Sequence, residues 1–334
     1  MSDESEVTVR LLRREEADLL IGLIRRCYGE TYIDSSFYDE AVVEGRLRDG
    51  ELSSVGAFDS GALVGHMGIT RRPWGGNTAD AGMTLVDPSY RGRGIARQVA
   101  VGLAEQSVAM GLVGVHDYPV TVHGATQRLA KGYGANTGLL LANMPADVSF
   151  ENMATDSARA RTSSLVRWLP FGRAGEREVY LPGRYRARIE ALYEDVRLAR
   201  VVHREDRQPE TLESRLQVRF DGRRLLGRGS VEVVGADLVS AAAEATKAVV
   251  DDGALVVHLD LALADRATPW AVEKLRRVGF SFAALLPEFR DGDTLRLQWV
   301  DPSVPVESAE VLATAATRAI EAFVFEDRAG LERR

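Results

Sequence analysis

The stretch RGRGIARQVA, at residues 91–100, alternates two arginines with two glycines and then takes on a helical pattern. Glycine permits positive φ and lets a ligand approach the backbone closely. The first turn of a helix leaves about four N–H groups without partners, and these favour an anion such as a pyrophosphate. The stretch therefore predicts a phosphate-binding loop that opens a helix. An exposed basic turn and an RGG-like nucleic-acid tail are the alternatives.

The composition narrows these alternatives. The chain has 334 residues, 45% of them hydrophobic, and a formal net charge of -7, which argues against a general nucleic-acid binder. No apolar run reaches the length of a membrane span and the first residues lack a signal-peptide core, so we expect a cytoplasmic protein with no nucleic-acid or membrane partner. The single cysteine, Cys27, excludes an internal disulfide framework and a cysteine zinc site, and we expect it to be a buried structural thiol. No metal site is predicted.

The residues on both sides of the loop alternate between strand and helix patterns. Strands are predicted at 7–12, 52–58, 62–69, 77–86, 112–118 and 137–144, and helices at 15–28, 39–48, from 94 or 95 to just before Gly111, and 124–135. A mixed order of this kind indicates an α/β layered domain, which we assign to residues 1–150.

The pattern breaks down near residue 149 and then restarts. Residues 151–178 are rich in arginine, and we predict a linker that docks its aromatic side chains and leaves its arginines in water; contact with an anionic ligand is the alternative. Residues 179–334 form the second predicted domain. Its predicted helices lie at 183–200, 236–253 and 268–280, and its predicted strands at 214–220, 224–234, 254–263, 281–287 and 293–300.

The two halves also align locally. At a constant offset of 145, HGATQRLAKGYGANTGLLL from His123 and TPWAVEKLRRVGFSFAALL from Thr268 place Gly134 on Gly279. Each is a short helix closed by glycine and followed by an apolar strand, which indicates an internal repeat. The second half has no counterpart of RGRGIA, because LLGRGSVEVV has the pattern of a hairpin and strand.

The stretch LVDPSYRGRGIA resembles the acetyl-CoA-binding motif of the GNAT N-acetyltransferase superfamily, whose pattern Gln/Arg-x-x-Gly-x-Gly/Ala is matched by Arg91, Gly94 and Ala96. The resemblance implies two tandem domains, each with a mixed, mostly antiparallel central sheet flanked by helices, the second being degenerate. It implies acetyl-CoA as cosubstrate, with the pyrophosphate on the loop amides and the pantetheine arm along the preceding strand. The implied cofactor-binding residues are Thr84, Leu85, Val86, Arg91, Gly92, Arg93, Gly94, Ile95, Ala96, His123 and Thr126.

The chain departs from the family at the second motif. The family has an Asn that touches the pantetheine arm and, seven residues later, a Tyr that protonates the leaving thiolate. Those positions are His123 and Ala130 here, and Thr268 and Leu275 in the second half, so neither half carries the usual acid. Tyr133 is a nearby substitute for that acid. His123 either donates a proton, contacts CoA or caps the helix.

The remaining catalytic candidates lie on predicted strands. Asp80 is a candidate base for the proton of the attacking amine, with a solvated aspartate at the start of a strand as the alternative. His116 lies near the thioester if its strand splays as in the family, and an imidazole titrates near neutrality. Glu30 and Tyr32 occupy the place where the family shapes its acceptor pocket; a surface turn is the other interpretation.

We therefore expect an N-acetyltransferase that moves an acetyl group from acetyl-CoA to an amine of a small molecule or peptide by direct attack. The second domain is expected to pack on the first and shape the acceptor cleft. A non-catalytic acyl-CoA-binding sensor or assembly module is the alternative. The acidic balance of the chain fits a cationic acceptor, and a homodimer is left open.

Overall fold

The structure is a computed structural model that describes residues 7–129, 133–148, 161–308 and 311–332. In the first half the elements are β1 (Thr8–Leu11), α1 (Ala17–Tyr28), α2 (Glu40–Arg48), β2 (Leu52–Asp59), β3 (Ala62–Thr70), β4 (Thr78–Val86), α3 (Ile95–Ala109), β5 (Gly114–Asp117), α4 (Ala125–Leu129), β6 (Ala135–Met144) and β7 (Thr162–Pro170). In the second half they are β8 (Arg177–Tyr180), α5 (Arg186–Val196), β9 (Arg200–His203), β10 (Arg215–Asp221), β11 (Leu226–Val233), α6 (Leu238–Asp251), β12 (Val256–Ala262), α7 (Thr268–Arg276), β13 (Ser281–Leu286), β14 (Thr294–Val300) and α8 (Ala315–Glu332).

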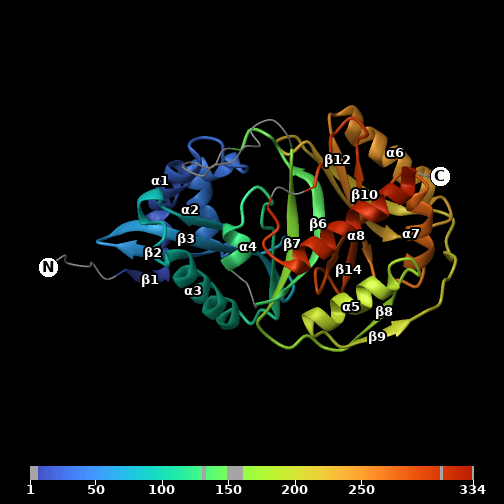
Figure 1. Cartoon of the computed structure of the whole chain (residues 1–334), viewed down its shortest axis with the longest axis horizontal. Coiled ribbons are helices and arrows are strands. Elements are labelled where there is room, and N and C mark those ends of the chain that lie inside the picture. The colour runs from blue at the N-terminus through green and yellow to red at the C-terminus, as the bar shows by residue number, and fades with distance from the viewer. Residues whose placement is uncertain (1–6, 130–132, 149–160, 309–310, 333–334) are drawn as a thin grey trace.

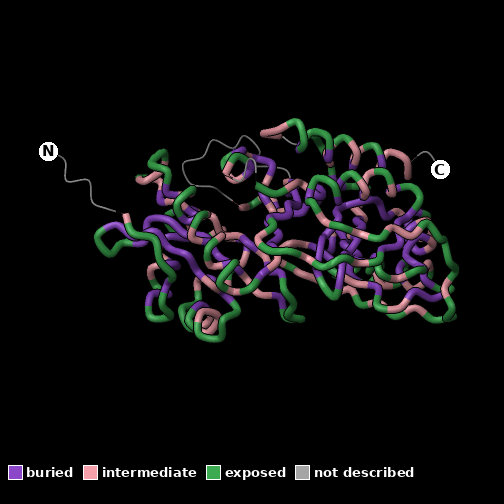
Figure 2. The backbone as a smooth tube through the Cα atoms, turned by 90° about the horizontal axis from the view of Figure 1, so that it is seen from below, coloured by how far each residue is buried: buried purple, intermediate pink, exposed green. Residues whose placement is uncertain are grey.

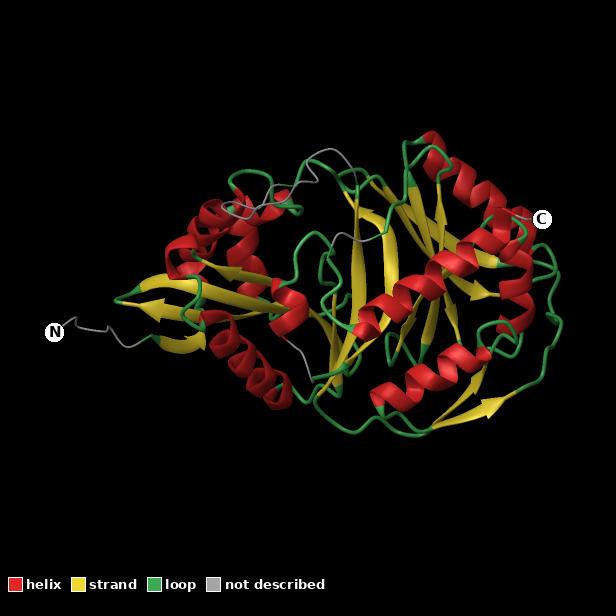
Figure 3. Cartoon of the chain, viewed as in Figure 1, coloured by secondary structure: helices red, strands yellow, loops and turns green. Residues whose placement is uncertain are grey.

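One sheet of twelve strands runs through the whole molecule (Figure 1), in the order β1-β2-β3-β4-β5-β7-β6-β13-β14-β12-β11-β10. Helices cover the sheet, and β8 and β9 form a separate pair beside it (Figure 3). The mixed α/β fold expected from the sequence is confirmed. The long C-terminal helix α8, which packs on β6 and β13, was not among the predicted elements.

The strand order of the first half recurs in the second. The sequence β3-β4-β5-β7-β6 corresponds to β10-β11-β12-β14-β13. In both series the second and third strands are parallel and the remaining neighbours are antiparallel. This repeat of order and direction extends the local alignment of the two halves to every strand of the sheet except β1 and β2.

The two halves meet where β6 pairs with β13. The strands are antiparallel, with Gly138 opposite Ala284. The side chain of Gln298, which is 1% exposed, crosses this seam: its Oε1 accepts from the Leu141 N–H at 2.9 Å, and its Nε2 donates to the carbonyls of Leu139 and Phe282. A buried amide that satisfies backbone groups on both strands fixes their register, because leaving those groups unpaired is costly.

The prediction of a linker over 151–178 is wrong for residues 162–170. They form β7, which lies between β5 and β6 inside the sheet. Trp168 on β7 is fully buried, and the buried guanidinium of Arg167 forms an ion pair with Asp117. A strand with both neighbours in place satisfies its backbone groups, and a solvated linker would leave them to water. The first unit of the sheet thus continues to Pro170, and residues 151–160 lie outside the described part.

The helices of the first half bury the faces that their spacing predicts. Leu20, Leu23, Ile24 and Cys27 line the buried face of α1. On α3, Ile95, Val99 and Leu103 recur at helical spacing and are buried in a different cluster. Burial raises the pKa of the Cys27 thiol to about 11, which fits a structural cysteine. Figure 2 shows buried backbone along the sheet and exposed turns around it.

Candidate active site

The glycine loop forms an open turn before α3. Gly92 and Gly94 have φ of 79° and 78°, in the left-handed region that glycine adopts without strain. Both are exposed, and a Cβ at either would meet nothing within 4 Å. Among the described residues, no acceptor pairs with the amides from Gly92 to Ala96. The loop therefore presents free N–H groups at a helix start, as the sequence predicted for a phosphate site.

The strand before the loop separates from its neighbour. β4 pairs with β5 only from Thr78 to Ala81, although β4 continues to Val86. Met83 takes a φ of 53°, and the register with β3 shifts in the same region. β5 ends at Asp117, opposite Ala81, so the segment from Gly82 to Val86 has one backbone edge without a partner strand among the described residues. An unpaired edge can accept an extended ligand as an added strand.

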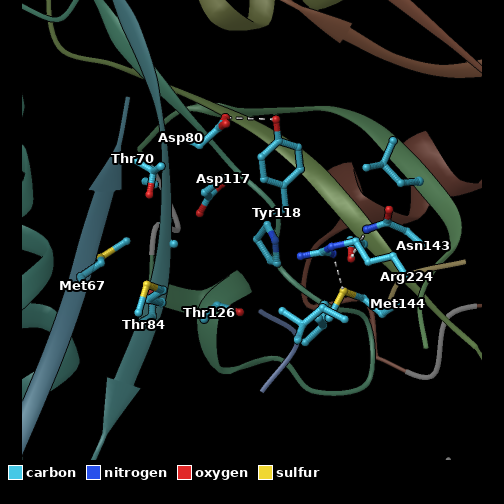
Figure 4. A pocket seen from close by; sticks show the side chains of 18 of the residues that line it. Met67, Thr70, Asp80, Thr84, Asp117, Tyr118, Thr126, Asn143, Met144 and Arg224 are labelled. Carbon is cyan, nitrogen blue, oxygen red and sulfur yellow. Dashed lines mark hydrogen bonds between the residues drawn. The ribbon is translucent and has the colours of Figure 1, made fainter. Parts of the chain in front are cut away.

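A cleft of about 1640 Å³ contains both features and extends to the second half of the sheet. The first half contributes Asp80 to Val86, the glycine loop without Arg93, and Tyr118. The opposite wall comes from β10, β11, β12 and β14 (Figure 4 shows part of the cleft). The two halves thus share one site.

Asp80 lies where β4 and β5 separate, and it is held by two partners. The buried guanidinium of Arg72 contacts both carboxylate oxygens, at 2.5 and 3.2 Å. The hydroxyl of Tyr118, which follows β5 directly, donates to Oδ1 at 3.2 Å (Figure 4). Enclosure in the cleft, and then the charge of Asp80, raise the pKa of Tyr118, so the phenol stays neutral.

His116 is placed beside this cluster but not in the cleft. The ring is fully buried against Trp168 and Phe289, and its Nδ1 accepts from Arg72 at 2.9 Å. Burial, and then the charge of Arg72, lower its pKa well below the usual value. The geometry therefore favours a structural, neutral histidine over the acid or base considered from the sequence.

The other predicted residues divide between the cleft and the surface. His123, Thr126 and Tyr32 line the cleft, and Thr84, Leu85 and Val86 form part of its β4 wall. Arg91, Gly92, Gly94, Ile95 and Ala96 line it at the loop, while Arg93 is exposed with its guanidinium over Tyr90. Tyr133 is 73% exposed and outside the cleft, and Glu30 is tied to Arg25 at the surface. Ala130 lies outside the described residues.

The sequence analysis missed Tyr118, Arg72 and the cationic residues of the second half. Tyr118 follows His116 by two residues in the same predicted strand, so the sequence predicts its place on the strand. The sequence does not predict that its hydroxyl meets Asp80. In the second half, the alternation in VHLDL at 257–261 places His258 and Asp260 on one face of β12. That alternation was the available signal for a polar wall.

In the second half, the segment before α6 occupies the place that the glycine loop has before α3, and its amides are bonded to other parts of the same chain. Before α6, the Gly235 N–H donates to Ser214 Oγ at 2.9 Å, and the N–H groups of Ala236 and Asp237 donate to carbonyls at residues 211 and 212. A Cβ at Gly235 would lie 2.3 Å from the backbone of Glu213. β11 also pairs with β12 over six residues, so these strands do not open as β4 and β5 do.

Part of the chain is similar to known acetyltransferases. Residues 18–118 match the model of the acetyltransferase (GNAT) family, so this part of the chain is a GNAT acetyltransferase domain. No curated protein matches the chain. Among the solved structures, a ribosomal-protein-S18-alanine N-acetyltransferase from Escherichia coli is 14% identical, with a TM-score of 0.41, over 51% of this chain and 97% of its own. A putative acetyltransferase from Salmonella typhimurium, solved with acetyl-CoA, is 14% identical with a TM-score of 0.40, over 51% and 97%.

Among the described residues, no helix is long and apolar enough to cross a membrane. The same residues hold no group of three or more His, Cys, Asp or Glu side chains placed to bind a metal ion.

Proposed function

We propose that the protein transfers an acetyl group from acetyl-CoA to an amine. The observation that carries this proposal is one cleft that contains an open glycine loop, an unpaired strand edge and a carboxylate–phenol pair. The GNAT domain at residues 18–118 supports acyl transfer in general. The choice of acetyl-CoA and of an amine acceptor is part of the proposal.

The residues present fit the cosubstrate. The amides from Gly92 to Ala96 have no acceptor among the described residues and lie at the positive end of the α3 dipole, and they would hold the pyrophosphate. The edge of β4 from Gly82 to Val86 would pair with the pantetheine arm. The thioester supplies an activated carbonyl carbon and a thiolate leaving group.

The transfer itself needs one bond formed, one broken and one proton moved. The neutral amine attacks the thioester carbonyl carbon, and the carbon–sulfur bond breaks as the amide forms. Nitrogen loses one proton and the thiolate sulfur gains one, so the reaction releases no net proton. We assign Asp80 and Tyr118 to carry it, because they bridge β4 and β5 where the strands open. An N–H of the unpaired β4 edge would stabilise the oxyanion.

The chain is then a tandem protein in which only the first unit holds a cosubstrate. The recurring strand order supports a second GNAT-like unit. The amides before α6, which pair with residues 211–214, support its having lost the phosphate site.

The test compares Tyr118→Phe with Tyr133→Phe while CoA release is followed with a panel of amines. General acid–base groups contribute about 10²- to 10⁴-fold, so Y118F should lower kcat by at least about 10². Y133F is the matched control and should keep wild-type kcat, because Tyr133 is exposed outside the cleft. The KM for acetyl-CoA should stay within about twofold in both variants.

Wild-type kcat in Y118F, or loss of kcat in Y133F, would overturn the assignment of Tyr118. Binding of acetyl-CoA without turnover of any amine would instead support a non-catalytic acyl-CoA-binding module.

A further inference from the structure

We propose that the acceptor amine carries an anionic group, a carboxylate or a phosphate, which binds to Arg224, Arg228 and His258 on the second-half wall of the cleft. This inference rests on the proposed function, because it names the acceptor class of the same site. It replaces the cationic acceptor that the net charge of the chain suggested.

The second-half wall is polar because its strands alternate. Val257, Leu259 and Leu261 of β12 enter the hydrophobic core, so His258 and Asp260 face the other way, into the cleft. Arg228 of β11 is the register partner of His258 and also lines the cleft. The wall is therefore a built surface on four paired strands, and its side chains start from a rigid backbone.

The positive charge of this wall is only partly balanced. Arg296 is satisfied by Asp260, with its Nε and Nη2 donating at 2.7 and 2.8 Å. Arg224 and Arg228 instead share the single carboxylate of Asp221, at 3.5 and 3.8 Å. These distances are too long for strong charge-assisted hydrogen bonds, which are typically about 2.7–2.9 Å. Within the described part of the chain, two guanidiniums facing one carboxylate leave at least one positive charge without a close counter-ion.

Arg224 has a further weak contact that an anion would replace. Its Nη1 lies 3.3 Å from the sulfur of Met144, and a thioether is a poor acceptor. Burial, and then the neighbouring charge of Arg228, lower the pKa of Arg224 to about 10. Both causes would be offset by an anion bound between the two arginines.

His258 is the most direct sign of a missing partner. The side chain is 2% exposed and lines the cleft, and its Nε2 has no hydrogen-bond partner among the described residues. Burial, and then the charges of Arg296, Arg228 and Arg224, lower its pKa well below the usual value, so the ring is neutral. A neutral imidazole can donate one N–H to an oxygen of the same anion that the arginines bind.

The position of this wall suits the acceptor and not the cosubstrate. The phosphate loop belongs to the first half, and Asp80 and Tyr118 mark the point where β4 and β5 open. Figure 4 shows Arg224 with Met144 across the pocket from Met67 and Thr84. An amine held by its anionic group on Arg224 and Arg228 would approach the opening of β4 and β5 from the side opposite β4.

The experiment uses amines with and without an anionic group: glucosamine 6-phosphate against glucosamine, and glycine against glycinamide. Each pair is compared at equal concentrations of the neutral amine, because the two amino groups of a pair differ in basicity. In at least one of the two pairs, wild-type kcat/KM should be at least about tenfold higher for the anionic member than for the neutral one, since one charge-assisted hydrogen bond corresponds to roughly that factor. Arg224→Gln with Arg228→Gln should remove the preference, by lowering kcat/KM for the anionic member at least about tenfold relative to that for the neutral member. Arg228→Glu should reverse it. Arg204→Gln with Arg207→Gln, which removes two positive charges at exposed sites, is the control and should keep the preference.

A second measurement separates this inference from the proposed function. With CoA saturating the glycine loop, calorimetry follows the binding of glucosamine 6-phosphate and glucosamine to the wild type and the double variant. If no amine is turned over but the phosphorylated sugar binds through Arg224 and Arg228, the anion site stands and the proposed function fails. If amines are acetylated with no preference for the anionic member, the function stands and the inference is overturned. If neither sugar binds and no amine is turned over, the inference is overturned. A weaker affinity for CoA in the double variant overturns it as well.

Discussion

Replacing Gly138 by alanine should pull the two halves of the sheet apart. A Cβ at this position would lie 2.3 Å from the Ala283 carbonyl oxygen, 2.3 Å from Ala284 Cβ and 2.5 Å from Ala284 Cα. These contacts are about 1 Å inside ordinary van der Waals distance, and they involve backbone and Cβ atoms that no rotamer change can move. Paired strands normally lie about 4.8 Å apart, so β6 and β13 must move beyond that distance to make room for the added Cβ.

The expected cost is about 3 kcal/mol or more, at the upper end of what overpacking causes, because the seam has no flexible side chain to absorb it. For a chain of 334 residues that corresponds to a fall in Tm of about 4 °C. Scanning calorimetry of Gly138→Ala measures it. Gly175→Ala is the control, since a Cβ there meets nothing within 4 Å. Equal Tm values for the two variants would refute this account of the seam.

Three further predictions concern the loop, a buried histidine and the contact between the halves. Gly94→Ala should raise the Kd for CoA roughly tenfold, because a left-handed alanine costs about 1–2 kcal/mol and its Cβ enters open space at the loop; calorimetric titration that gives an unchanged Kd would contradict it. Burial lowers the pKa of His66 to about 4, so on acidification the unfolded chain binds a proton at this histidine before the folded chain does. The contribution of neutral His66 to the free energy of unfolding is therefore present above about pH 6.5 and is lost as the pH falls toward 4. Denaturant unfolding of His66→Gln should show a pH dependence reduced by about 3 kcal/mol over that window relative to wild type, and parallel curves would exclude the effect. Phe289→Ala removes the second-half ring whose centroid lies 4.2 Å from the Arg72 guanidinium. The variant should lower kcat at least about tenfold, with little change in the KM for acetyl-CoA. An unchanged kcat would mean that residues of the first half are sufficient to position Arg72.

Local patterns predicted most of the elements correctly. The spacing of Leu23 and Cys27 gave α1, and glycine before an apolar helical stripe gave the start of α3. These features depend on residues a few positions apart, so the chain itself carries the signal. β7 was missed because a strand inserted between two earlier strands is specified by its neighbours in space, and its arginines resemble a solvated segment until Arg167 meets Asp117.

The candidate site divides in the same way. The sequence by itself determined the glycine loop, because positive φ and free first-turn amides are local properties of RGRGIA. It also determined that the usual acid position is not a tyrosine. Only the tertiary structure decided that Tyr118 meets Asp80, that His116 is enclosed by Arg72 and aromatic rings, and that arginines of the second half face the cleft. Contacts between residues 38 and 44 positions apart, and between the two halves, depend on strand order and register, which are not visible in a single sequence.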